Sequence, residues 1–128
     1  MANPNIVSVA TIAGGSLGHH LLVADTAVMT VTAEYIIKIN SITVANVDGT
    51  NAATCDIRVV KQNVTPLGIT NVDTSGTFYL AKTVNVPADD ILVVTDTPFY
   101  MMAGDALSAL ASANSDLDIL ISFEAIVD

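Results

Sequence analysis

The residues with the clearest potential for chemistry lie between Gly14 and His20. Gly14, Ser16 and Gly18 match the letter pattern of the nucleophile elbow of serine hydrolases, in which a serine attacks a carbonyl carbon and a histidine accepts its proton. That elbow is a strained turn between a strand and a helix, and its histidine comes from a distant part of the chain. Here His19 and His20 come only three and four residues after the serine, and no helical pattern comes after them. The sequence therefore favours a flexible glycine-rich loop, and no enzyme activity is predicted.

The adjacent residues His19 and His20 could also begin a metal site, because imidazole nitrogen is a common metal ligand. Neighbouring residues of a strand point to opposite faces, however, and no cysteine or third histidine lies near them in the sequence. Zinc sites in proteins draw on several such side chains that converge on one ion. A solvated histidine pair is the favoured interpretation.

Two acidic pairs and one cysteine are the other side chains that could bind an ion or attack a substrate. Asp89-Asp90 and Asp116-x-Asp118 offer oxygen ligands for calcium, but neither stretch has the spacing of an EF-hand loop. Solvated turns are favoured for both pairs. Cys55 lies in an alternating apolar run and is expected to face the core, where cysteine behaves as a small hydrophobe. No metal, no cofactor and no reactive thiol is predicted.

Length, composition and charge limit the class of protein. The chain has 128 residues, of which 52% are hydrophobic, a size and composition that suit one domain with an unstapled core. Thirteen acidic residues against four basic ones give a net charge of −9, so nucleic acid is not an expected partner. No apolar run approaches the roughly 18 to 20 residues of a membrane helix, so no membrane partner is expected. A single cysteine and the lack of a hydrophobic leader argue against a secreted, disulfide-stapled domain.

The stretch 35–60 predicts two strands joined by a tight turn. Residues 35–44 and 55–60 are rich in β-branched side chains, and Asp48-Gly49 lies between them. Asp-Gly between such runs is among the strongest short-range signals of a β-hairpin, because glycine accepts the positive φ that these turns require. We therefore expect an antiparallel hairpin with Asp48-Gly49 at its tip.

Short strands separated by Gly, Pro, Asn and Asp fill the rest of the chain, which predicts an all-β fold. The cleanest alternation lies in residues 117–125, where only Leu120 is out of step. Residues 103–113 are alanine-rich and leave a helix open as a second interpretation. Runs at about 8 to 12 residue spacing indicate an antiparallel β-sandwich, jelly-roll-like and single-domain. We expect residues 1–20 to form an N-terminal arm with a glycine-rich loop, and residues 21–128 to form the sandwich.

The segment that contains Phe99, Tyr100 and Met101 admits two interpretations. Aromatic residues and methionine are enriched in the cores of interfaces, so the segment could be an exposed adhesive patch. It could equally pack into the core as part of an edge strand. Both interpretations remain open at the level of sequence.

Several segments together resemble small β proteins of the virions of tailed bacteriophages, especially marine ones. The resemblance covers most of the chain and is carried by turns and core strands, with no active-site motif among them. Residues 66–71 depart from it, being longer and more irregular than the corresponding part of that family. The segments that carry it are residues 1–7 (MANPNIV), 39–53 (INSITVANVDGTNAA), 78–83 (FYLAKT), 86–89 (VPAD), 103–107 (AGDAL) and 112–118 (SANSDLD).

The resemblance implies a structural protein of the phage particle, of the decoration or cement type, which binds the major capsid protein at the capsid surface of the virion. It also implies self-association as a homotrimer at lattice axes. Residues 1–18 are expected to reach a neighbouring subunit, because poorly patterned termini often become ordered only on contact. The residues expected at the partner interface are Asn5, Ile6, Val7, Phe99, Tyr100 and Met101.

Two other classes of function remain in view. A tail, collar or fibre component could use the same sandwich as an adaptor or to bind host carbohydrate, and saturable glycan binding would favour that role. A small hydrolase would predict that Ser16→Ala abolishes a measurable activity, and we expect no such activity.

Overall fold

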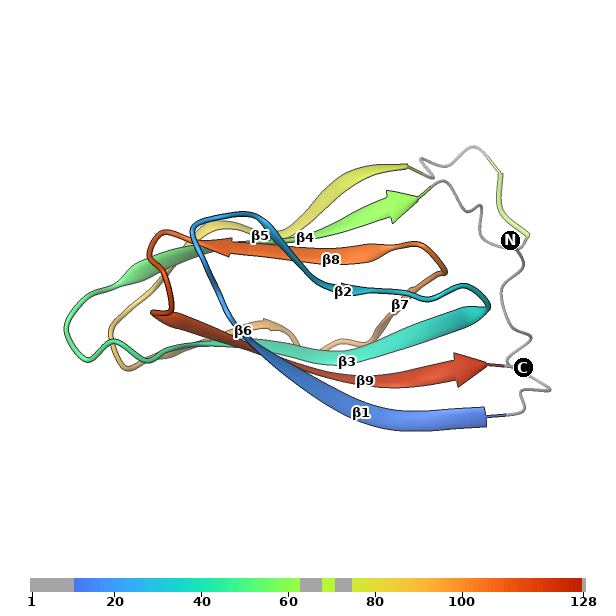
Figure 1. Cartoon of the computed structure of the whole chain (residues 1–128), viewed down its shortest axis with the longest axis horizontal. Helices are drawn as coiled ribbons and strands as arrows, with labels where there is room; N and C mark the ends of the chain where they lie inside the picture. Colours follow the sequence, from blue (N-terminus) through green and yellow to red (C-terminus); the bar gives the residue numbers. More distant parts are fainter. Residues whose placement is uncertain (1–10, 63–67, 71–74, 128) are drawn as a thin grey trace.

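The computed structural model describes residues 11–62, 68–70 and 75–127 (Figure 1). Within these residues the chain forms nine strands and no helix, which confirms the predicted all-β class. The strands are β1 (Thr11–His20), β2 (Thr26–Thr30), β3 (Tyr35–Asn46), β4 (Ala53–Gln62), β5 (Ser75–Val86), β6 (Ile91–Thr95), β7 (Phe99–Met101), β8 (Ala106–Ala111) and β9 (Leu117–Val127).

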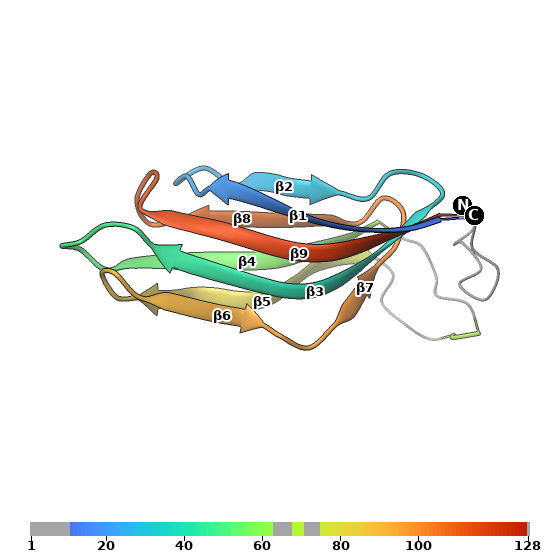
Figure 2. The same cartoon turned by 90° about the horizontal axis from the view of Figure 1, so that it is seen from below.

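The strands form two antiparallel sheets that pack face to face. Figure 1 shows one layer above the other, and Figure 2 looks onto the sheet that contains β1, β9, β3 and β6, with the second sheet behind it. The first, here called the β1 sheet, has the order β1-β9-β3-β6, with β7 pairing beside β6 along the same edge of β3. The second, the β2 sheet, has the order β2-β8-β4-β5. The pairs β1–β9, β2–β8, β3–β6 and β4–β5 are nested like one long hairpin wound into a sandwich. This winding is that of a jelly roll, as predicted.

The predicted hairpin between residues 35 and 60 is wrong, although its two strands exist. β3 lies in the β1 sheet between β9 and β6, and β4 lies in the β2 sheet between β8 and β5. Residues 47–52 therefore cross between the layers, and Gly49 does not adopt the positive φ of a tight hairpin turn. Local turn chemistry marked the reversal of the chain, but the competition for pairing partners decided which strands became neighbours.

The crossing is held by the buried side chain of Asn46 at the end of β3. Its Nδ2 donates hydrogen bonds to the carbonyl oxygens of Asn51 and Val86, each at 2.9 Å. Its Oδ1 accepts a hydrogen bond from the backbone N–H of Asp48 at 2.8 Å. One amide thereby ties the β3–β4 crossing to the end of β5, where the chain crosses back to the β1 sheet through residues 87–90.

Asp48 organises the same crossing through its carboxylate and makes it sensitive to acid. Hydrogen bonds from the backbone N–H of Thr50 (2.8 Å), the Asn51 side chain (3.2 Å) and the Asn51 N–H (3.3 Å) lower the pKa of Asp48 below its ordinary 3.8. A lowered pKa means that the folded state takes up this proton less readily than the unfolded state. The stabilisation is therefore fully present above the ordinary pKa and is lost as the pH falls through the lowered pKa.

We accordingly expect the wild-type protein to lose more stability between pH 5 and about pH 3 than the Asp48→Asn variant does. Urea denaturation at both pH values measures this difference. Asp96→Asn removes the same charge at an exposed position and serves as the control. Identical pH dependence in wild type and Asp48→Asn would contradict the assigned role of the Asp48 carboxylate.

β1 corrects the expectation of a flexible loop at residues 14–18. Its ten residues pair with β9 without interruption, from Thr11 opposite Val127 to His20 opposite Asp118. Pairing along a formed strand outweighs the poor strand propensity of glycine. Gly15 also leaves room for a core side chain, because a Cβ at that position would lie 3.1 Å from the Phe123 ring. Residues 11–20 thus belong to the sandwich, and residues 1–10 of the expected arm lie outside the described residues.

The core lies between the two sheets and is almost entirely aliphatic. The alternation predicted for residues 117–125 is confirmed in β9, where residues 117, 119 and 121 are buried and Leu120 is exposed. Residues 106–111 form strand β8, so the helix interpretation of that region is wrong. Cys55 is fully buried, and burial raises the pKa of its thiol to about 11, which suits an inert core residue. The largest fully buried apolar side chains are Leu21, Ile39, Ile42, Val44, Ile57, Val86, Met101, Leu107, Leu117, Ile119 and Ile121.

Candidate functional site

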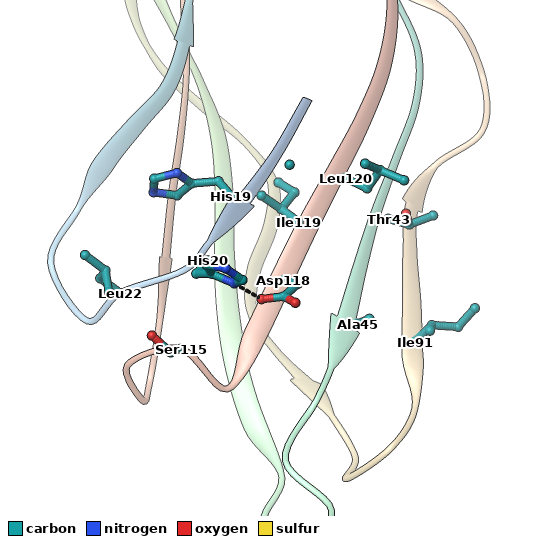
Figure 3. Close-up of a pocket in the computed structure, with 11 residues that line it drawn as sticks. His19, His20, Leu22, Thr43, Ala45, Ile91, Ser115, Asp118, Ile119 and Leu120 are labelled. Carbon is teal, nitrogen blue, oxygen red and sulfur yellow. Dashed lines mark hydrogen bonds and ion pairs between the residues drawn. The ribbon is translucent and has the colours of Figure 1, made fainter. Parts of the chain in front are cut away.

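A groove of about 830 Å³ lies on the outer face of the β1 sheet (Figure 3). It runs across β1, β9, β3 and β6 near the connection between β8 and β9. Strand alternation explains much of its lining, because Thr43 and Ala45 of β3 and Asp118 and Leu120 of β9 alternate with buried residues and so point away from the core. The side chains that define its character are His20, Leu22, Ala45, Ile91, Asp118 and Leu120.

The polar part of the groove is a hydrogen-bonded pair formed by the side chains of His20 and Asp118. The β1–β9 register places the two residues opposite each other, although 98 positions separate them in the sequence. His20 Nδ1 lies 2.6 Å from Asp118 Oδ1, and because an ionised carboxylate only accepts hydrogen bonds, Nδ1 is the donor of this contact. The side chains are 76% and 36% exposed, so solvent screens the pair and its contribution to stability is small.

The apolar part of the groove continues into an exposed aliphatic patch. Leu120, Ile91 and Val93 are 55%, 63% and 50% exposed. The register places Leu120 and Val93 on either side of Thr43 and places Ile91 beside Ala45 in the neighbouring row. We call Leu120, Ile91 and Val93 the aliphatic patch. Exposed apolar side chains that gather on one rigid face are typical of a contact surface.

The structure does not assemble the serine-hydrolase arrangement that the letter pattern suggested. Ser16 lies in the interior of β1, in an extended strand of an antiparallel sheet and not in a turn before a helix. Ser16 and His20 are four residues apart in one strand, which is roughly 13 Å at about 3.3 Å per residue. Proton transfer needs hydrogen-bond contact between the two groups. The described geometry therefore does not join them as nucleophile and base.

The two histidines diverge, as expected for adjacent residues of a strand. His20 reaches Asp118, whereas His19 points away from that pair (Figure 3). His19 Nε2 is buried without a hydrogen-bond partner among the described residues. Across residues 11–62, 68–70 and 75–127, no three His, Cys, Asp or Glu side chains come close enough together to hold a metal ion.

The acidic pairs occupy turns and strand ends. Asp89 and Asp90 form the turn between β5 and β6, where Asp90 Oδ1 accepts a hydrogen bond from the N–H of Ile91 at 2.8 Å. Asp116 precedes β9, and its carbonyl oxygen accepts a hydrogen bond from the N–H of Val47 at 2.8 Å. These contacts give the acidic residues local structural roles at one end of the sandwich.

The predicted interface residues are found in different surroundings. Tyr100 is exposed, Phe99 is partly buried against the core, and Met101 is fully buried. Met101 must therefore be removed from the predicted contact surface, because the alternation of β7 turns it into the core. Asn5, Ile6 and Val7 lie outside the described residues.

Sequence reasoning missed the groove because its parts come from distant strands. The one available signal was Leu120, an apolar residue on the polar side of an otherwise regular alternation.

Comparisons with protein-family models, with curated proteins and with solved structures found no match for this chain. No helix that could cross a bilayer was found in the part of the chain that the structure describes.

Proposed function

We propose that this protein decorates and cements a phage capsid by binding the lattice of the major capsid protein at the virion surface. The observation that carries the proposal is the aliphatic patch of Leu120, Ile91 and Val93 beside the groove. The net charge of −9 would limit nonspecific association with other proteins outside the patch. The major capsid protein is proposed as the partner because of the resemblance to virion β proteins. The same resemblance is the basis for proposing a homotrimer at lattice axes.

The proposed mechanism requires no reaction. Each square ångström of apolar surface removed from water contributes about 25 cal/mol, and a stable contact buries about 800 Å² on each partner. The patch lies on a paired sheet, so little conformational freedom is lost when it binds. The protein would thus add buried area across the joints between capsid subunits and raise the stability of the shell.

Binding to purified capsids that lack the protein tests this function. We expect wild-type protein to co-sediment with the shells, and Leu120→Asp to bind at least about tenfold more weakly. Leu80→Asp on β5 is the matched control, because Leu80 is also exposed but lies in the opposite sheet. Equal binding by both variants would exclude the patch as the contact. Density for the chain on the tail and not on the head, in micrographs of whole particles, would refute the capsid role.

The groove supports a second candidate, a tail, collar or fibre component that binds host carbohydrate. A polar pair flanked by aliphatic side chains is a usual composition for a small-molecule site. His20 and Asp118 would supply hydrogen bonds to sugar hydroxyl groups. Saturable glycan binding that is lost in Asp118→Ala, combined with no binding to capsids, would favour this candidate over the cement function.

A further inference from the structure

Among the described strands, β1 has the longest regular edge that no other described strand pairs with. β1 ends its sheet, and β9 is its pairing partner among the described strands. All ten residues pair with β9 with no bulge, so the opposite edge presents a regular row of backbone N–H and C=O groups. Such an edge is a ready template for a further strand unless something protects it.

The other edge strands of the two sheets are β2, β5, β6 and β7, and each carries such protection; β7 has only three residues. β2 and β6 have five residues each, and each pairing contains a register shift. β5 is longer, but its pairing with β4 is broken twice, and Thr83 within it has a φ of +51°. Short strands and bulges are common means of preventing edge-to-edge association. β1 has neither.

The chemistry of β1 matches a second copy of itself. Residues 11–20 contain no Asp, Glu, Lys, Arg or Pro, although the whole chain has a net charge of −9. Two copies would repel each other over most of their acidic surfaces but not along this neutral strand. A strand of a different protein that recognised its partner through charged side chains would meet no Asp, Glu, Lys or Arg in residues 11–20. Small residues such as Gly14 and Gly18 also leave space for a close approach.

We propose that β1 pairs antiparallel with β1 of a second copy across a two-fold axis, which joins two β1 sheets into one continuous sheet. If the axis is perpendicular to the sheet, the outward faces of both copies stay on the same side. Leu17 packs against the core, so Ser16 points outward. Ser16 lies next to the middle of β1, and in a central register it faces Ser16 or Gly14 of the second copy.

This position allows a charge-exchange experiment. Ser16→Lys and Ser16→Glu are each expected to weaken self-association roughly tenfold, because like charges then lie opposite each other or diagonally across the new pair, depending on which of the two registers forms. Mixing the two variants is expected to restore association, because opposite charges then meet. Thr77→Lys and Thr77→Glu place the same charges on the exposed part of β5 and are the controls. Light scattering over a concentration series measures the mass, and circular dichroism verifies the fold of each variant.

The inference goes beyond the proposed function and does not depend on it. A two-fold contact predicts an even number of subunits, namely a dimer or, if three-fold contacts also form, a hexamer. At concentrations where the variants with a charge at position 16 dissociate at the two-fold contact, the measured mass should be half that of the wild type. The inference would be overturned if the wild-type protein were monomeric over the whole concentration series. It would also be overturned if an oligomer kept the same mass after a charge was introduced at position 16. A trimer whose mass does not change with charge at position 16 would overturn this inference but would leave the proposed cement function untouched. Capsid binding tests that function separately.

Discussion

Replacing Asp105 with alanine is expected to lower the free energy of unfolding by about 3 to 5 kcal/mol. Asp105 is fully buried in the turn between β7 and β8. Its Oδ2 accepts hydrogen bonds from Lys61 Nζ at 2.5 Å and from the N–H of Met102 at 3.0 Å, and its Oδ1 accepts one from the N–H of Gln62 at 3.2 Å. One carboxylate therefore joins the end of β4 to the turn that leads into β8.

The large effect follows from what remains after the substitution. Lys61 has a side chain that is only 19% exposed, and the loss of Asp105 would leave its charge largely buried without this partner. The N–H groups of Gln62 and Met102 would both lose the acceptor that Asp105 provides, and losing the buried hydrogen bond of Met102 adds about 1 to 3 kcal/mol to the cost. Urea denaturation measures the change, and Asp96→Ala at an exposed position is the control. A loss below about 1 kcal/mol would show that water replaces the carboxylate without penalty.

The substitution Asn46→Asp is expected to cost about 3 kcal/mol or more, although it changes the shape of the side chain very little. The amide of Asn46 donates to two carbonyl oxygens, those of Asn51 and Val86. A carboxylate cannot donate, and its negative charge would face both of these oxygens in a buried site. Because Asn46 ties one inter-sheet crossing to the end of β5, the loss should reduce the cooperativity of the whole sandwich as well.

Asn114→Asp is the matched control for Asn46→Asp. The Asn114 side chain acts as an acceptor, since its Oδ1 receives a hydrogen bond from the N–H of Val23 at 2.9 Å. A carboxylate keeps that role, so this exposed position should tolerate the change. The melting temperatures of Asn46→Asp and Asn114→Asp are compared by thermal unfolding. The first variant loses a hydrogen-bond donor, whereas the second keeps its acceptor. Equal destabilisation would contradict the role assigned to the Asn46 amide and would indicate a general effect of added negative charge.

The two proposed surfaces of the β1 sheet are compatible with each other. The aliphatic patch lies on β9, β3 and β6, whereas the free edge belongs to β1 at the end of the sheet. Two copies joined through β1 would turn both patches to the same side. A pair could then bind a repeating lattice at two points, and its avidity would exceed the affinity of one copy without any new contact.

Periodicity and turn residues were enough to predict the β class and the strands at residues 35–44, 55–60 and 117–125. The alternation around Leu117 and Ile121 identified the buried face of β9, and Cys55 was correctly placed in the core. These features are local, because the direction of a side chain along a strand depends only on its own position in the pleat. A sandwich of such strands followed from the spacing of the turns.

The choice of partner strands could be decided only by the folded molecule. Residues 35–60 carry a strong hairpin signal, yet β3 and β4 lie in opposite layers, and the glycine-rich residues of β1 form a strand because β9 offers them a partner. The contacts of His20 with Asp118 and of Lys61 with Asp105 likewise join distant parts of the chain. Pairing is a competition among all strands for backbone hydrogen bonds and burial, and its outcome depends on contacts that no short stretch of sequence contains.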